Sequence, residues 1–263
     1  SAPTGVTAQT ATTPAAEKKP THFITVETPL AAFTFSDLGG SIESVKLQKY
    51  RETVKKDSSG KELVEDIKPL SYLPRVFKTM NGQIIDDRTY FKADRGNVKV
   101  TDKSETIVFA GSLTDGKQVK KTYTFHPDKY TIDMKVEVEG SATDQTMVDF
   151  AIISGKKENS YVFKGPFTYD GKKFEQIEKI EKSTDVRKGL RYAGLDEGFF
   201  AFIWIPNDES RFPLSILKAE NDVPLLRLAA DKGTVAGSLY FGPKQTDILK
   251  SLNINAQKII DFG

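Results

Sequence analysis

The sequence contains no cysteine and only two histidines, His22 and His126, among its 263 residues. The absence of cysteine excludes disulfides, thiolate nucleophiles, zinc–cysteine sites and iron–sulfur clusters. Two histidines leave little material for a histidine-based metal site or a proton relay. We therefore expect no metal and no cofactor. His126, which lies between a strand-like run and Pro127, is interpreted as a solvated turn residue and not as a general base.

Long hydrophobic runs and an excess of one charge are also missing. The longest strongly apolar run, Phe199–Ile205, has seven residues, whereas a transmembrane helix needs about 20. The 38 Lys and Arg residues nearly balance the 36 Asp and Glu residues and leave a net charge of +2. So small a net charge creates no strong global field toward nucleic acid or an anionic membrane. We expect no nucleic-acid partner.

The common catalytic motifs are absent as well. The sequence has no Gly-rich phosphate-binding loop, no dinucleotide-binding fingerprint, no Gly-x-Ser-x-Gly elbow and no His-Glu-x-x-His pair. The adjacent acids Asp86 and Asp87 could hold a cation or act on a glycosidic bond. They lack a third ligand at calcium-loop spacing, so we interpret them as part of a solvated loop. The sequence thus predicts no enzyme.

Residues 1–21 differ in amino-acid composition from the rest of the chain. Small polar residues and recurring proline dominate, and Val6 is the only sizeable apolar side chain up to Pro20. Such a segment buries too little apolar surface to offset its ordering entropy, which predicts a flexible linker. A linker at the start implies a tether to something upstream, and we expect residues 22–263 to form one domain cut from a longer protein.

From Phe23 onward the pattern is typical of β-strands. Ile132, Met134 and Val136 alternate with Asp133 and Lys135, the period of two that a half-buried antiparallel strand requires. Similar runs span 23–27, 32–35, 42–47, 98–101, 106–110, 119–125, 147–153, 160–163, 176–180, 199–205, 214–219, 225–229 and 235–241. Turn-forming pairs such as Gly39-Gly40 separate them. This spacing predicts two packed antiparallel sheets or a large barrel.

The C-terminus departs from the strand pattern. Pro243 follows Gly242 at a plausible first helical position, and Ile248, Leu249 and Leu252 fall on one face of a helix. Residues 256–262 predict a second short helical turn. We therefore expect a helical segment over residues 243–262 that docks on the β domain.

The aromatic run near residue 200 is the densest apolar feature. Phe199, Phe200 and Trp204 supply the large contact area that peptide or sugar clefts use. A central strand buried on both faces explains the same run more simply. A mixed outcome, with one edge of the strand lining a groove or partner surface, stays open.

Three stretches resemble one known family. The first, residues 23–50, has a Gly-Gly turn followed by a strand that ends in Leu47-x-x-Tyr50. The second, residues 192–206, places an aromatic pair before an apolar run that ends in Ile-Pro. The third comprises Leu239-Tyr-Phe-Gly-Pro-Lys244 and the terminal Ile-Asp-Phe-Gly of residues 260–263. Together they resemble the large periplasmic domain of the YidC family of bacterial membrane protein insertases.

The resemblance implies a β-supersandwich of mutarotase-like or sugar-binding-like topology with one or two C-terminal α-helices. It implies a non-catalytic domain on the periplasmic side of the bacterial inner membrane, tethered at residues 1–21 and followed by a transmembrane segment. The resemblance implies two kinds of partner. One is the Sec translocon, through components such as SecD/SecF, and the other is nascent membrane proteins, to which the domain would give chaperone-like support. Residues expected to couple it to the membrane region are Ile248, Leu249, Leu252, Ile254, Ile259, Ile260 and Phe262.

Two other classes of protein remain open. One is a carbohydrate-binding or mutarotase-like β-sandwich protein of the envelope, which would need acid–base groups that a single domain histidine, His126, supplies poorly. The other is an autonomous structural or adhesive β protein.

Overall fold

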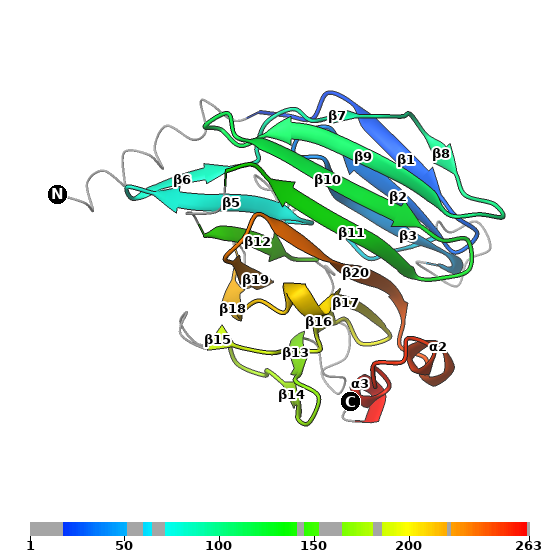
Figure 1. The fold of residues 1–263 in the computed structure, drawn as a ribbon. Helices are drawn as coiled ribbons and strands as arrows, with labels where there is room; N and C mark the ends of the chain where they lie inside the picture. Colours follow the sequence, from blue (N-terminus) through cyan, green and yellow to red (C-terminus); the bar gives the residue numbers. More distant parts are fainter. Residues whose placement is uncertain are drawn as a thin grey trace.

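In the computed structural model the chain folds mainly into β-strands, with short helices at the C-terminal end (Figure 1). The structure describes residues 18–51, 60–64, 72–140, 145–152, 165–180, 186–219 and 222–261. Within these ranges the strands form three hydrogen-bonded sheets, where the sequence pattern predicted two sheets or a large barrel. All strand pairs are antiparallel except β1 with β8. The prediction of a mainly β, antiparallel fold is therefore confirmed.

The first sheet has five strands in the order β4-β3-β2-β1-β8. They are β1 (Phe23–Glu27), β2 (Ala31–Ser36), β3 (Ser41–Arg51), β4 (Gly60–Glu62) and β8 (Val98–Lys99). The Gly39-Gly40 pair makes the turn from β2 to β3, with φ of +86° and +59°. Glycine adopts such positive φ values without the steric cost that a side chain would impose. The turn predicted at this pair is thus present.

The second sheet is the largest, with nine strands in the order β14-β13-β16-β17-β20-β11-β10-β9-β7. The first five of these are β14 (Phe174–Gln176), β13 (Gly165–Tyr169), β16 (Tyr192–Asp196), β17 (Phe200–Pro206) and β20 (Thr234–Pro243). The others are β11 (Thr131–Val138), β10 (Gln118–Phe125), β9 (Glu105–Ser112) and β7 (Lys92–Ala93). Strands β17 and β20 lie side by side at the centre of this sheet.

The third sheet has six strands in the order β15-β18-β19-β12-β5-β6. They are β5 (Arg75–Met80), β6 (Gln83–Asp86), β12 (Thr146–Phe150), β15 (Val186–Arg187), β18 (Leu214–Lys218) and β19 (Pro224–Ala230). The hairpin of β5 and β6 forms one edge and extends away from the C-terminal helices (Figure 1). The sequence pattern missed β4, β5, β6, β7, β13, β15 and β16, and the run predicted over 176–180 meets only the last residue of β14. The run predicted over 160–163 lies outside the described residues.

The alternation in β11 shows how sequence determines which side chains enter the core. Ile132, Met134 and Val136 are buried, whereas Asp133 and Lys135 face solvent. Because successive side chains of a strand point to opposite faces, this pattern gives one apolar face and one wet face. The buried face of β11 joins a single large cluster of buried residues that draws on all three sheets.

Aromatic side chains fill the part of that cluster between the first and second sheets. Phe35 of β2 packs on Phe109 of β9 at 5.2 Å between ring centroids and on Tyr123 of β10 at 4.8 Å. Phe33 contacts Phe125 at 5.1 Å in the same way. Such tilted and offset pairs add to the area that the rings bury, so these contacts hold the two sheets together.

The chain ends in two short helices, α2 (Thr246–Lys250) and α3 (Lys258–Asp261), which follow β20. Pro243 is the last residue of β20 and Gln245 is the N-cap of α2. The prediction of Pro243 as the first helical residue is therefore wrong, because the strand pairs Pro243 with Phe200 of β17. The prediction of two helical pieces over residues 243–262 agrees with α2 and α3, although both are shorter.

In the described part of the chain, none of the helices has the length and apolar character needed to cross a membrane.

Candidate functional site

The C-terminal segment, defined here as residues 244–261, is attached to the sheets through a buried ion pair. Lys244 Nζ lies 3.0 and 2.9 Å from the two carboxylate oxygens of Asp196. The side chains are only 7% and 1% exposed, respectively. A pair this deeply buried holds both groups in place, because removing either partner leaves an uncompensated charge away from water. The pair therefore fixes the first residue of the segment against the end of β16.

The same two residues also organise the turn between β16 and β17. The Asp196 carboxylate accepts a hydrogen bond from Gly198 N at 2.8 Å, and Lys244 N donates to Phe199 O at 2.8 Å. Glu197 N donates to Phe200 O at 2.8 Å and closes the hairpin. The turn and the start of the C-terminal segment are thus one hydrogen-bonded unit.

Tyr50, at the end of β3, adds a contact from the first sheet. Gln245 Nε2 donates a hydrogen bond to Tyr50 Oη at 2.7 Å. The Tyr50 ring meets Phe200 edge to face at 5.4 Å between centroids. Lys61 Nζ lies 5.9 Å from the Phe200 ring centroid, within the range of a cation–π contact. We call Tyr50, Asp196, Phe200, Lys244 and Gln245 the clamp.

A second attachment holds the far end of the segment. Tyr192 Oη donates a hydrogen bond to Asn255 O at 3.0 Å, and Asn255 Nδ2 donates one to Tyr169 Oη at 3.3 Å. Lys258 Nζ lies 5.8 Å from the Tyr169 ring centroid. Burial raises the pKa of Tyr192, to which the neighbouring Tyr169 also contributes, so its hydroxyl remains a hydrogen-bond donor at neutral pH.

The residues predicted to couple the domain to a membrane region divide into two groups in the structure. Leu249 and Ile259 are completely buried in the main core. The remainder are partly buried and pack against that core: Ile248, Leu252, Ile254 and Ile260. Phe262 lies outside the described residues. Because Ile259 is core, Ile259→Asp would place a charge in apolar surroundings and destabilise the domain, so that substitution cannot separate coupling from folding.

The three aromatic residues predicted for a cleft or partner surface have different environments. Phe199 is 77% exposed, Phe200 is half-buried and Trp204 is 1% exposed. The Trp204 ring stacks on Phe150 at 5.0 Å between centroids. Trp204 therefore contributes to the core and not to an open surface in this structure, because β17 is central and covered on both faces. Phe199 alone has a largely free ring.

Two hollows flank the C-terminal segment. The larger, about 840 Å³, is lined by Tyr50, Tyr130 and Gln245 among others. The smaller, about 680 Å³, is lined by Tyr169, Arg191 and Asn255 among others. Both hollows reach Ile205 of β17 and Asn253 of the segment. The stretch between α2 and α3 thus passes between two openings large enough for a ligand or a peptide side chain.

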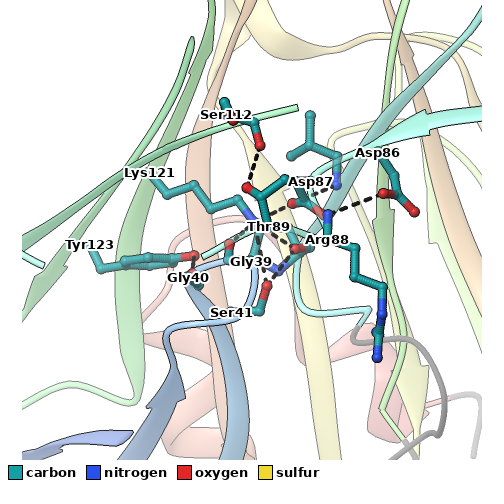
Figure 2. A network of polar contacts seen from close by, with 12 residues as sticks. Gly39, Gly40, Ser41, Asp86, Asp87, Arg88, Thr89, Ser112, Lys121 and Tyr123 are labelled. Carbon is teal, nitrogen blue, oxygen red and sulfur yellow. Dashed lines mark hydrogen bonds and ion pairs between the residues drawn. The ribbon is translucent and has the colours of Figure 1, made fainter. Parts of the chain in front are cut away.

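A second buried ion pair lies where the three sheets meet (Figure 2). Lys121 Nζ of β10 is 2.6 Å from Asp87 Oδ2, and both side chains are buried, at 0% and 6% exposed. The ammonium also donates to Gly39 O at 2.6 Å and to Pro74 O at 3.0 Å. The prediction of a solvated loop at Asp86 and Asp87 is therefore wrong, because Asp87 pairs with Lys121, 34 residues further along the chain. Asp86 is the last residue of β6, and its carboxylate lies 3.2 Å from Arg75 Nη2.

The Gly39-Gly40 turn supplies part of this polar cage. Besides the Gly39 carbonyl, Gly40 O accepts a hydrogen bond from Tyr123 Oη at 2.9 Å. A Cβ added at Gly40 would lie 2.8 Å from Phe109 Cβ. The turn can approach the aromatic core this closely only without side chains, and the Gly39 carbonyl then reaches the buried ammonium of Lys121 (Figure 2).

Burial is the main influence on the titration of this pair. Desolvation raises the pKa of the Asp87 carboxyl, while the Lys121 charge and hydrogen bond oppose the rise. Desolvation likewise lowers the pKa of Lys121, and Asp87 opposes the fall. The pair is therefore stable only as a unit, since each charge depends on the other for compensation.

His126 is more constrained than predicted. Its Nδ1 lies 2.7 Å from Ser104 Oγ and its Nε2 lies 2.9 Å from Asp133 Oδ2. The ring is held between Ser104, which directly precedes β9, and Asp133 of β11, which corrects the expectation of a solvated turn residue. Ser104 is exposed, as is about half of the Asp133 side chain, and none of the three residues lines either hollow beside the C-terminal segment. The described residues contain no cluster of three or more potential metal ligands among His, Asp and Glu.

A family model described as the YidC periplasmic domain matches residues 23–263. The membrane protein insertases YidC of Syntrophus aciditrophicus and Geobacter metallireducens are 28% and 29% identical to this chain over 258 and 270 residues. The matches cover 91% and 95% of this chain but 47% and 49% of those relatives. The chain thus spans about half the length of the curated relatives it matches.

The chain is also similar to solved structures, of which two are described. The periplasmic domain of the Thermotoga maritima YidC is similar over 93% of this chain and 98% of its own, with 12% identity and a TM-score of 0.48. An α-mannosidase from Enterococcus faecalis is similar over 92% of this chain and 32% of its own, with 8% identity and a TM-score of 0.56. At this identity the α-mannosidase similarity concerns the fold alone.

The antiparallel sheets and the docked C-terminal helices define a mainly β, supersandwich-type domain. The family match extends over nearly the whole chain. The chain belongs to the YidC periplasmic domain family.

Proposed function

We propose that this chain is a non-catalytic domain of a YidC-type membrane protein insertase, located on the periplasmic side of the bacterial inner membrane. Its role is to hold the C-terminal segment in a fixed position, so that the domain and the membrane-embedded remainder of the protein move as one body. The family match and the names of the relatives support the insertase assignment. The length of the relatives beyond the match leaves room for the membrane-embedded part.

The observation that carries this proposal is the convergence of the three family-like stretches on the clamp. Tyr50 comes from the first stretch, Asp196 and Phe200 from the second, and Lys244 from the third. These residues are far apart in sequence, and Tyr50 and Gln245 are separated by 195 positions. The buried Lys244–Asp196 pair and the Tyr50–Gln245 hydrogen bond both hold the first residues of the C-terminal segment, as a segment kept in a fixed position requires.

The expected partners are nascent membrane proteins and, on the family resemblance, Sec translocon components such as SecD/SecF. Within this proposal the flanking hollows and the exposed Phe199 are available surfaces for such partners. We propose Leu249 and Ile259 as the core anchors of the coupling element, and Ile248, Leu252, Ile254 and Ile260 as its partly buried contacts.

The test compares two buried lysines in the full-length insertase. Lys244→Met breaks the clamp, whereas Lys78→Met breaks a different ion pair, in which Lys78 Nζ lies 2.8 Å from Asp115 and the lysine side chain is 6% exposed. Each variant is expressed in cells depleted of their own insertase, and insertion of a reporter membrane protein is measured. We expect Lys244→Met to impair insertion far more than Lys78→Met at a comparable protein level. Equal effects of the two variants on insertion would mean that the clamp only stabilises the fold, and would contradict the coupling role.

The carbohydrate-binding alternative is supported by the fold alone. The α-mannosidase similarity shows that related β architectures occur in glycosidases, and the smaller hollow presents polar groups around Tyr169. Titration calorimetry of this chain against hexoses and against extended peptides separates the two functions. A clear hexose signal would favour the carbohydrate reading over the insertase role.

A further inference from the structure

A chain of polar side chains crosses the solvent face of the second sheet. Ser104 Oγ lies 2.7 Å from His126 Nδ1, and His126 Nε2 lies 2.9 Å from Asp133 Oδ2. Ser238 Oγ donates a hydrogen bond to Asp133 Oδ1 at 3.1 Å. These residues lie in or directly beside β9, β10, β11 and β20, which are neighbours in the sheet (Figure 1). A hydroxyl, an imidazole and a carboxylate in this order are the parts of an activated nucleophile.

The strand register brings the first two residues together. β9 and β10 pair Glu105 with Phe125, so the next position along both strands places Ser104 opposite His126. Phe125 is buried in the core, and because successive side chains of a strand point to opposite faces, His126 belongs to the solvent face. Asp133 extends from the same face of β11, where its side chain is about half exposed. The arrangement therefore follows from the pairing of the sheet.

The Asp133 carboxylate determines which ring nitrogen of the neutral His126 carries the proton. An ionised carboxylate can only accept a hydrogen bond, so its contact at 2.9 Å places the proton on Nε2. Nδ1 is then an acceptor, and the Ser104 hydroxyl donates to it at 2.7 Å. His126 thus has the geometry of a general base for Ser104, a role that the sequence alone did not indicate.

The other histidine of the chain lacks this arrangement. Thr21 Oγ1 and Asp37 Oδ2 both contact the same nitrogen of His22, Nδ1, at 3.0 and 3.2 Å. One ring nitrogen cannot accept a proton from a hydroxyl and donate one to a carboxylate at the same time. The His22 side chain is also 83% exposed, compared with 19% for His126. His22 is therefore a matched control for His126.

We propose that Ser104 is a modification site, at which the hydroxyl takes an acyl group from an activated carboxylic ester with His126 as the base. Ser104 Oγ forms a bond to the carbonyl carbon while its proton passes to His126 Nδ1. The bond between that carbon and the alcohol oxygen then breaks, and the leaving alcohol takes the proton from His126. The products are the Ser104 ester and the free alcohol.

The solvent exposure of Ser104 lets an acyl donor reach its hydroxyl. A single transfer to this serine modifies the domain and needs no turnover. The proposal goes beyond the insertase role and is independent of it, because none of the three residues belongs to the clamp or to the C-terminal segment.

The first test maps the acylation of this chain by p-nitrophenyl acetate. Peptide mass spectrometry follows the rate of acetylation at Ser104 and at Ser251, an exposed serine whose hydroxyl donates to Ile248 O. We expect Ser104 to react about tenfold faster than Ser251 or more. His126→Gln should slow acetylation of Ser104 by about a hundredfold, whereas His22→Gln should leave it unchanged. Equal rates at the two serines, or an unchanged rate in His126→Gln, overturns the proposal.

A fluorophosphonate probe ensures that rapid loss of the acetyl group does not hide the reaction. The probe forms a phosphorus–oxygen bond with an activated serine and releases fluoride, and the phosphonate ester is not readily hydrolysed. The unaltered chain should be labelled at Ser104, and the label should be lost in Ser104→Ala. Urea unfolding checks that the variants are folded. Failure of the probe to label Ser104 in the unaltered chain overturns the proposal.

Asp133 is a positioning residue, because it acts on Ser104 only through His126. Nitrogen NMR of the imidazole ring in mildly alkaline buffer distinguishes the two tautomers. We expect a proton on Nε2 in the unaltered chain, and a shift toward Nδ1 in Asp133→Asn, because the amide can donate to Nε2. Acylation of Ser104 should slow in the same variant. A proton on Nδ1 in the unaltered chain contradicts the proposal, since the hydroxyl would then have no acceptor. Slower acylation with an unchanged tautomer contradicts the role of Asp133.

Discussion

Lys244 Nζ contacts both carboxylate oxygens of Asp196, at 3.0 and 2.9 Å, across 48 positions of sequence. Both side chains are more than nine-tenths buried. This pair joins the end of β16 to the first residue after β20, and so determines where the C-terminal segment begins its path over the sheets. The stability and the dynamics of the segment should therefore depend on it.

A double-mutant cycle should reveal the coupling within this pair. Lys244→Met removes the ammonium that contacts both oxygens of the buried Asp196 carboxylate, and we expect a loss of about 3 kcal/mol in the free energy of unfolding. Asp196→Asn combined with Lys244→Met removes both charges, so the double variant should lose less than the sum of the single variants. Urea unfolding followed by Trp204 fluorescence measures all four species. Strict additivity would show that the two side chains do not interact.

The Lys121–Asp87 pair should give a pH-dependent defect when it is broken. Burial raises the pKa of Asp87 even with Lys121 present, and Lys121→Met removes the charge that opposes the rise. A carboxyl whose pKa is raised in the folded state binds more protons than in the unfolded state, so its contribution to stability falls as pH rises above its unfolded value of 3.8.

The deficit of Lys121→Met relative to the unaltered chain should therefore be smaller near pH 4 than at pH 7, where we expect about 3 kcal/mol or more. Urea midpoints at both pH values provide the measurement. Adding Asp87→Asn to Lys121→Met should flatten the pH dependence of the deficit, since the amide does not titrate. A deficit that grows on acidification would contradict the assignment to Asp87.

Glycine at position 40 should be far less replaceable than glycine at position 82. Both residues have positive φ, +59° and +77°, so alanine at either site meets the same backbone penalty of about 1–2 kcal/mol. A Cβ at Gly40 also collides with Phe109 at 2.8 Å, whereas a Cβ at Gly82 meets nothing within 4 Å.

We expect Gly40→Ala to lower the free energy of unfolding by about 1–3 kcal/mol more than Gly82→Ala, because the core must shift to admit the extra methyl group. Thermal unfolding of the two variants gives the comparison. Similar losses for both would mean that Phe109 relaxes freely and that packing is not the reason for glycine at this turn.

Much of the fold was predictable from local pattern. The period of two in residues 131–138 predicted β11, and the all-apolar run 199–205 predicted a strand buried on both faces, which β17 is. The stripe at Ile248, Leu249 and Leu252 predicted the helical end, although the Gly-Pro pair before it belongs to β20. Each of these patterns lies within a few consecutive residues, so the sequence alone is enough to recognise the strand or helix.

The polar contacts of the site were not predictable in the same way. Asp87 reads as a loop carboxylate until Lys121 is brought to it by the packing of β10, and Asp196 gives no sign of a partner 48 residues away. Charged residues are usually solvated, so sequence alone favours exposure for each of them. Only the tertiary arrangement decides which few charged residues are buried. The Tyr50–Gln245 contact was likewise not predictable, because it depends on how distant parts of the chain pack together.

The central claim is that the clamp holds the C-terminal segment, and amide hydrogen exchange tests it most directly. Exchange is measured by mass spectrometry for the unaltered chain, for Lys244→Met and for the control Lys78→Met. In Lys244→Met, exchange should accelerate across residues 246–261 and the β16–β17 turn, while β10 and β11 keep their protection. Unchanged exchange in residues 246–261, or the same acceleration there in Lys78→Met, would contradict the claim.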